Sequence, residues 1–196
     1  PPALVACWPR GGGKSSTVSF MLAMTCLTGM RDYCLWAGAR QQAITDKVSG
    51  VGALLAAPRV RAAFPEQTAL YHDPMTGTKV DWRQGRVATG SGFAVDAVGM
   101  DQAMRGALRL SSRPGFVILD DIETTQQTPY MRARVAEQVT RAIIPTQSDN
   151  AALIWVQNRL HDETLMSSML DSKLDWFRRR VVSGPWPQIE GLEVEL

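Results

Sequence analysis

The chain alternates short apolar runs with amphipathic stretches, a pattern typical of a sheet whose strands are joined by helices. Two apolar runs near the start, Ala3–Cys7 and Tyr33–Gly38, have the length of strands. Between them, apolar residues recur at helical spacing through Phe20, Met24 and Leu27. The first forty residues therefore predict strand, helix, strand.

A second helix and a less regular stretch follow. Apolar residues at helical spacing predict a helix over Gln41–Ala56; they are Ile44, Val48, Val51 and Leu55. Residues 73–77 have the composition of a turn, and the segments around it predict a hairpin from Leu70 to Val87. Residues 87–90 then predict a strand edge that leads into a glycine-containing loop.

Two later apolar runs end in polar side chains. Residues 116–119 are followed by Asp120, Asp121 and Glu123, which predicts a buried central strand that delivers carboxylates to its carboxyl end. Residues 152–156 predict a second such strand. The polar pair Gln157 and Asn158 ends it, and the start of a helix with acidic residues follows. Ligands of open α/β sheets bind at this edge.

The amino-acid composition restricts the possible class and partners of the protein only slightly. The 196 residues suit one domain with a sizeable core, and 45% apolar and 20% charged residues are ordinary for a globular protein. A net charge of +2 does not demand nucleic acid, although arginine far outnumbers lysine and suits phosphate contacts. Cys7, Cys26 and Cys34 lack metal-ligand spacing, and we expect reduced thiols, with the first two in the core. No membrane span or signal peptide is visible.

The glycine-rich segment after the first strand has the composition of a phosphate-binding loop. It runs Trp8-Pro9-Arg10-Gly11-Gly12-Gly13-Lys14-Ser15-Ser16 and precedes the first predicted helix. Glycines let backbone amides approach phosphate oxygens, and the helix N-terminus adds partial positive charge. Lys14 would reach the β- and γ-phosphates, and the Ser15 hydroxyl would bind Mg²⁺. The alternative is a glycine-rich turn that only caps the helix, and Trp8 stands where the usual pattern has its first glycine.

The acidic run supplies the groups that a nucleotide hydrolase needs. Asp120 would hold Mg²⁺ through water, and either Asp121 or Glu123 would orient the attacking water. Asp121 is adjacent to Asp120, whereas Glu123 has the longer reach, so the residues leave both open. The alternative is a strand followed by a solvated acidic turn. After the later strand, Asn158 would lie at a strand tip, where an amide can sense the γ-phosphate.

Together these motifs resemble the ATPase (motor) domain of the large terminase subunits of tailed bacteriophages. The segment after the last strand, from Arg159 to Leu165, is similar to that family's arginine, apolar, histidine, acidic, leucine signature. The phosphate loop, whose arginine lies four residues before the lysine, is similar to the Walker A motif of that family. The acidic run is similar to its Walker B motif. Residues 40–64, Arg105-Gly106 and residues 175–187 resemble further parts of the domain. Asn158 departs from the family's common threonine.

The resemblance implies ATP hydrolysis that drives double-stranded viral DNA into a procapsid, with ATP and Mg²⁺ as cofactors. The nucleotide would be bound by Arg10, Gly11, Gly12, Gly13, Lys14, Ser15 and Ser16, and the metal by Ser15 and Asp120. Arg10 would reach the γ-phosphate in cis, and Arg105 is the candidate finger acting in trans. Asn158 and Arg159 would couple loss of the γ-phosphate to movement.

The resemblance also implies partners and context. They are duplex DNA, the portal protein, the small terminase subunit and further copies of the chain in a ring, without a membrane, in the cytoplasm of an infected bacterium. We expect residues 1–196 to form one ATPase domain as a fragment of a larger protein, without the upstream adenine-binding segment and the C-terminal nuclease. Residues 177–196 would close the domain or begin a linker.

Two other functions remain open from the sequence. A helicase-like translocase or another P-loop enzyme would use the same chemistry, and a nucleotide-binding switch would bind without turnover. Arg178, Arg179 and Arg180 are candidates for contact with the DNA backbone or form a solvent-facing strand.

The predicted fold is α/β: a three-layer P-loop NTPase of the additional-strand, catalytic-carboxylate type, with a mostly parallel central sheet. We expect the acidic strand beside the phosphate-loop strand.

Overall fold

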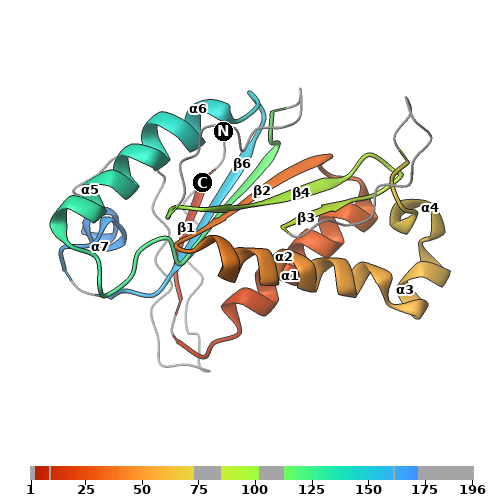
Figure 1. Ribbon diagram of the computed structural model, residues 1–196, viewed down its shortest axis with the longest axis horizontal. Helices are drawn as coiled ribbons and strands as arrows, with labels where there is room; N and C mark the ends of the chain where they lie inside the picture. Colours follow the sequence, from red (N-terminus) through yellow and green to blue (C-terminus); the bar gives the residue numbers. More distant parts are fainter. Residues whose placement is uncertain (1–2, 9, 73–84, 102–112, 161, 172–196) are drawn as a thin grey trace.

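The computed structural model describes residues 3–8, 10–72, 85–101, 113–160 and 162–171. They form three layers, with a central sheet between two sets of helices (Figure 1). Helices α1 to α4 lie on one side of the sheet, and α5, α6 and α7 lie on the other. The predicted α/β class with a mostly parallel sheet is confirmed.

Six strands and seven α-helices are present in the described parts of the chain. The strands are β1 (Ala3–Cys7), β2 (Tyr33–Gly38), β3 (Arg86–Ala88), β4 (Ala94–Gly99), β5 (Phe116–Asp120) and β6 (Ala152–Gln157). The helices are α1 (Lys14–Thr28), α2 (Gln41–Ala56), α3 (Pro58–Ala63), α4 (Pro65–Thr68), α5 (Pro129–Gln138), α6 (Ile144–Thr146) and α7 (Leu165–Leu170). A π-helical turn, η1 (Val139–Ile143), joins α5 to α6.

The sheet has the strand order β1-β6-β5-β2-β4-β3, and only β3 runs antiparallel to its neighbour. Strand β6 pairs with both β1 and β5, so it separates the strand before the glycine-rich loop from the acidic strand. The predicted adjacency of those two strands is therefore wrong. All three strands are parallel, so their carboxyl ends still meet at one edge of the sheet.

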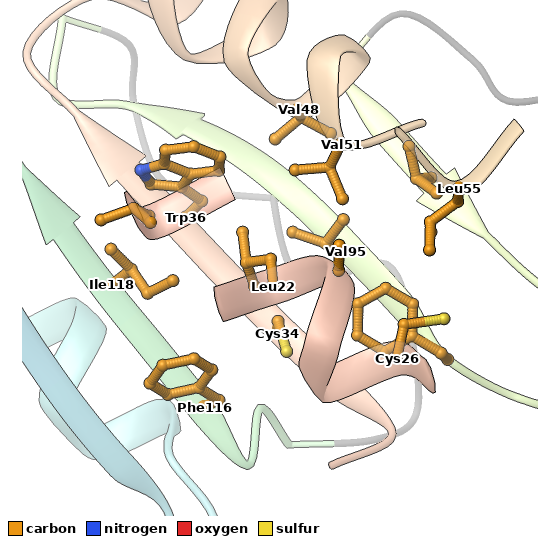
Figure 2. Close-up of a cluster of buried hydrophobic side chains, with 14 of the residues drawn as sticks. Leu22, Cys26, Cys34, Trp36, Val48, Val51, Leu55, Val95, Phe116 and Ile118 are labelled. Carbon is orange, nitrogen blue, oxygen red and sulfur yellow. The ribbon is translucent and has the colours of Figure 1, made fainter. Parts of the chain in front are cut away.

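Two apolar cores cover the faces of the sheet. One lies between the sheet and helices α1 and α2, and it contains Leu22, Trp36, Val48 and Ile118 (Figure 2). The other lies on the opposite face and contains Trp155 together with side chains of α5 and η1. Both tryptophans are fully buried and contribute to the packing of these cores. A sheet covered on both faces explains why its central strands are apolar throughout.

Helix α1 lies where the apolar spacing predicts a helix, but two of the residues that gave this spacing face solvent. Phe20 is 63% exposed and Met24 is 43% exposed, whereas Val18, Leu22 and Cys26 are buried. Residues 18–27 are apolar on almost every side, so periodicity does not distinguish the two faces. The orientation that the preceding loop gives to α1 decides which side of the helix packs against the sheet.

Several other predictions can be compared with the described chain. Helix α2 and strand β2 have the predicted bounds. The predicted hairpin from Leu70 falls largely outside the described residues; Leu70 itself pairs with Thr89 in an antiparallel bridge. Strand β4 and helix α5 were not predicted. Cys26 and Cys34 are buried, but Cys7 is exposed, which corrects its expected place in the core.

Candidate functional site

The glycine-rich loop lies between the end of β1 and the start of α1. Gly11 and Gly13 have φ angles of 79° and 76°, in the left-handed region that favours glycine. Trp8 donates its indole N–H to the Gly12 carbonyl at 2.9 Å, and its backbone N–H to the Gln157 carbonyl at 2.9 Å. The tryptophan in the place of a first glycine thus braces the loop and joins it to β6.

The N-terminus of α1 is open to an anion. Gly13 is the N-cap and offers no side-chain hydrogen bond, and the first turn contains no acidic residue. The amides that begin a helix of 15 residues therefore have no capping side chain, and the helix dipole favours negative charge there. Ser15 is half-buried and Ser16 is exposed in this first turn. Arg10 precedes it on the loop and is exposed.

Lys14 and the acidic run meet at the carboxyl edge of the sheet. The Lys14 ammonium forms an ion pair with Asp121 Oδ1, and it lies 3.8 Å from Asp120 Oδ1. Asp120 ends β5 two residues after Ile118, so its side chain emerges on the face covered by α1 and α2. Asp121 has a φ of 48°, an uncommon backbone conformation for a residue other than glycine. This turn directs consecutive carboxylates toward the glycine-rich loop.

Lys47 is a second lysine at this edge. Its ammonium lies 2.6 Å from Asp120 Oδ2 and 6.0 Å from the centre of the Trp36 ring. The Asp120 side chain has no solvent exposure. A buried carboxylate needs compensating charge, and Lys47 and Lys14 supply it.

Glu123 has a different environment from Asp121. It is 2% exposed, and its two oxygens accept the backbone N–H groups of Leu165 at 2.8 Å and Met166 at 3.1 Å. Its Oε2 also accepts the Gln157 amide at 3.0 Å, and its own backbone N–H donates to Gln157 Oε1. Glu123 therefore joins the ends of β5 and β6 to the first turn of α7. Asp121 is the carboxylate that faces Lys14.

The structure separates the two predicted coupling residues. Asn158 directly follows β6, beside the point where Gln157 binds Trp8, and its buried Oδ1 has no hydrogen-bond partner. Arg159 is directed to acidic side chains instead, since it pairs with Asp162 at 2.9 Å and Asp171 at 3.6 Å. Asn158 therefore adjoins the glycine-rich loop. The remaining predicted residues, Arg105 and the Arg178, Arg179 and Arg180 cluster, lie outside the described residues, as does residue 161.

The donor set at this edge fits Mg²⁺ held partly by a nucleotide. No group of three or more His, Cys, Asp or Glu side chains within the described ranges forms a metal cluster. Asp120 Oδ1 is buried without a hydrogen-bond partner, which leaves one carboxylate oxygen for an ion or its water. Mg²⁺ is bound in such sites by one or two protein groups, with phosphate and water completing its shell. Asp120 and the Ser15 hydroxyl are the groups that would hold it.

Sequence reasoning missed Lys47 and Gln157. Lys47 is a single lysine on the polar flank of an amphipathic helix, and nothing in the local pattern separates it from a solvated residue. Gln157 carried a signal, because it is a polar residue at the end of an apolar strand. It is fully buried and also accepts a hydrogen bond from the Trp155 indole at 3.3 Å.

A cavity of about 450 Å³ lies at the opposite edge of the sheet, where β2, β4 and β5 begin. Arg31, Arg86 and Arg113 are among its lining residues. Parallel strands of five or six residues separate it from Lys14 and Asp120. Within the described chain, no helix is long and apolar enough to cross a membrane.

Comparison with known proteins finds similar folds among solved structures. No protein-family model matches the chain, and no curated protein matches it. Among solved structures, the N-terminal domain of the DNA packaging ATPase from bacteriophage phi29 is similar, with a TM-score of 0.52 and 11% sequence identity. The match covers 93% of this chain and 86% of that one. At this identity the likeness shows the fold, and it agrees with the fold that the motifs implied.

Two further solved structures of phage proteins are similar to this chain, with lower TM-scores. The Phi-28 gp11 DNA packaging motor matches with a TM-score of 0.49 and 13% identity, over 80% of this chain and 46% of that chain. The Thermus phage P74-26 large terminase ATPase domain matches with a TM-score of 0.48 and 20% identity, over 80% of this chain and 59% of that chain.

Proposed function

We propose that this chain is a P-loop ATPase that hydrolyses ATP to ADP and phosphate and uses the reaction to move double-stranded DNA. The observation that carries the proposal is the meeting of Lys14 with Asp120 and Asp121 at the open N-terminus of α1. A lysine, a helix N-terminus and paired carboxylates are the groups that phosphoryl transfer to water requires. The same groups support a hydrolase over a simple glycine-rich turn.

The loop side of the site binds the triphosphate. Backbone amides from Gly11 to Ser15 and the Lys14 ammonium hold its oxygens, and Arg10 adds a cation from the exposed side of the loop. Lys14 must leave Asp121 to do so, which frees that carboxylate for the reaction. Bound Mg²⁺ would neutralise charge on the phosphates, with Asp120 and Ser15 as its protein groups.

Asp121 is the residue we assign to orient and activate water. Its carboxylate faces the loop and is partly exposed, whereas both oxygens of Glu123 are engaged by backbone amides. A general base must reach the proton that it removes, and only Asp121 has that freedom in this arrangement. Glu123 then serves to hold α7 and β6 together.

The assignment of DNA as the partner comes from the motifs and from the fold shared with a phage DNA packaging ATPase. We further propose that the chain acts in a ring of identical subunits with a portal protein and a small terminase subunit, in an infected bacterial cell. Arg105 of a neighbouring copy would complete the site. Contact with duplex DNA through phosphates would be independent of sequence and weakened by salt.

Steady-state ATP hydrolysis tests the proposal, measured with and without linear duplex DNA, with Lys14→Ala as the blank. We expect turnover that depends on Lys14 and rises with intact duplex. Nucleotide binding without turnover would instead indicate a nucleotide switch. Strand separation on forked DNA would indicate a helicase-like translocase, since a packaging motor moves along intact duplex.

A further inference from the structure

Lys47 adds a positive charge to the site from helix α2, outside the glycine-rich loop. Its Nζ lies 2.6 Å from Asp120 Oδ2, while Oδ1 of the same carboxylate lies 3.8 Å from Lys14 Nζ. Oδ1 has no hydrogen-bond partner. The two oxygens of Asp120 thus have different environments, one held by α2 and one facing the loop.

The start of the helix that carries Lys47 is anchored to the sheet. Gln41 donates its amide to the Ala97 carbonyl at 3.1 Å and accepts the Gly99 N–H at 2.6 Å. The ammonium itself lies near the ring of the buried Trp36. The Lys47 side chain is 26% exposed, so water screens its charge only in part. Its contact with Asp120 follows from the position of α2 against β2 and β4.

A cation that shares a buried carboxylate with a metal ion weakens the binding of that metal. Lys47 reduces the negative charge that Asp120 offers, and it repels a divalent ion at Oδ1. The effect is the same whether Lys47 stays on Oδ2 or withdraws, because breaking the ion pair also takes free energy. Removing the charge at position 47 should therefore strengthen metal binding, which is the opposite of what local damage to the site would do.

We propose that Lys47 competes with the divalent metal for Asp120 and lowers the intrinsic metal affinity of the site. The metal is then retained chiefly together with a nucleotide, whose phosphate oxygens supply further ligands. The proposal rests on the proposed function in one respect, the role of Asp120 as the metal carboxylate. Lys47 is a positioning residue here, since it acts through Asp120.

Mn²⁺ binding to the 196-residue chain tests this, with free Mn²⁺ measured by electron paramagnetic resonance, first alone and then with saturating ADP. Three variants are compared with the wild type: Lys47→Met removes the charge and keeps an apolar stem of similar length, Lys47→Arg keeps the charge, and Asp120→Asn removes the carboxylate. We expect Lys47→Met to bind Mn²⁺ about tenfold more tightly than the wild type. Lys47→Arg should match the wild type, and Asp120→Asn should lose most of the binding. Circular dichroism checks that each variant is folded.

Equal or weaker Mn²⁺ binding by folded Lys47→Met would overturn the competition, because a merely structural role predicts that direction. If Lys47→Met does not fold, Lys47→Gln replaces it, with the same expectation. ADP binding that depends on Lys14 reports on the proposed function separately. If ADP binds in a Lys14-dependent way and Lys47→Met has an unchanged Mn²⁺ affinity, the Lys47 proposal alone is rejected. If no ADP binding depends on Lys14 and no form of the protein binds Mn²⁺, the Lys47 proposal and the proposed function are both rejected.

Discussion

At the scale of single residues, the site is defined by how three carboxylates are used. Asp120 is fully buried between two lysines, and Asp121 faces the glycine-rich loop from a left-handed backbone conformation. Glu123 is buried and caps α7. Carboxylates within four positions of one another thus have three different environments, which match the metal-binding and catalytic roles proposed for Asp120 and Asp121 and the structural role of Glu123. Their surroundings differ because each turns toward a different element.

Exchanging two of these carboxylates for amides separates the roles. Asp121→Asn should reduce ATP turnover by at least about 10²-fold, since it removes the proposed general base. It should leave the unfolding temperature nearly unchanged, because the Asp121 side chain is 43% exposed. Glu123→Gln should destabilise the chain by about 1–3 kcal/mol, because it weakens buried hydrogen bonds to backbone amides. Turnover assays and urea unfolding measure the two effects. Loss of turnover in Glu123→Gln with unchanged stability would show that Glu123 is the base.

The buried thiols are suited to packing rather than reaction. Burial raises the pKa of Cys26 to about 11, and it raises the pKa of Cys34 further. Both thiols stay protonated at neutral pH and lie in the core shown in Figure 2.

At the scale of elements, close contact between α2 and the sheet sets the position of Lys47. Gly99 ends β4 directly against the first turn of α2, and a Cβ atom there would overlap the backbone of Gln41. Gly38 ends β2 under Ile44, and a Cβ atom there would overlap the side chain of that residue. Glycine at these two strand ends lets the helix approach the carboxyl edge closely enough for Lys47 to reach Asp120.

Alanine at two glycines of this region should have opposite effects. Gly99→Ala should destabilise the chain by about 1–3 kcal/mol, because backbone has to move to make room. Gly50→Ala is the matched control: it lies inside α2, and a Cβ there meets nothing within 4 Å. That variant should gain up to about 1 kcal/mol from the higher helix propensity of alanine. Thermal unfolding measures both. Equal stability of the two variants would contradict the close contact of α2 with β4.

At the scale of the whole molecule, the sheet brings distant segments to one edge. The glycine-rich loop, Lys47, the acidic run and Gln157 come from four separate elements and meet where parallel strands end. The arginine-lined cavity occupies the opposite edge. Binding at the carboxyl edge should therefore stabilise contacts between elements that are remote in the chain.

Ligand binding should appear as a change in global stability. ADP with Mg²⁺ at a hundred times its dissociation constant should raise the unfolding temperature by about 5–10 °C, since a ligand that binds only the folded state stabilises it. Lys14→Ala should show no such rise, and chelating the metal should reduce it in the wild type. Differential scanning fluorimetry is sufficient. A similar rise in Lys14→Ala would place the nucleotide elsewhere on the molecule.

The sequence by itself determined the local elements and the loop chemistry. Strand β2 and helix α2 were predicted with their observed bounds, and the acidic strand and the last strand were located by apolar runs that end in polar residues. Helix α1 begins directly after the glycine-rich segment, as the sequence predicts. These features depend on spacing and conformational preference among close neighbours in the chain, so a local pattern contains them.

Only the tertiary structure decided strand order, the buried face of α1 and the partner of each charged side chain. The sequence does not state that β6 lies between β1 and β5, because β6 pairs with residues 150 positions away in β1 and 36 positions away in β5. It left Asp121 and Glu123 equivalent, and it contained no signal for Lys47, whose contact with Asp120 spans 73 positions. Such contacts are chosen by the packing of whole elements, and electrostatic roles depend on burial and distance, which arise only when the chain is folded.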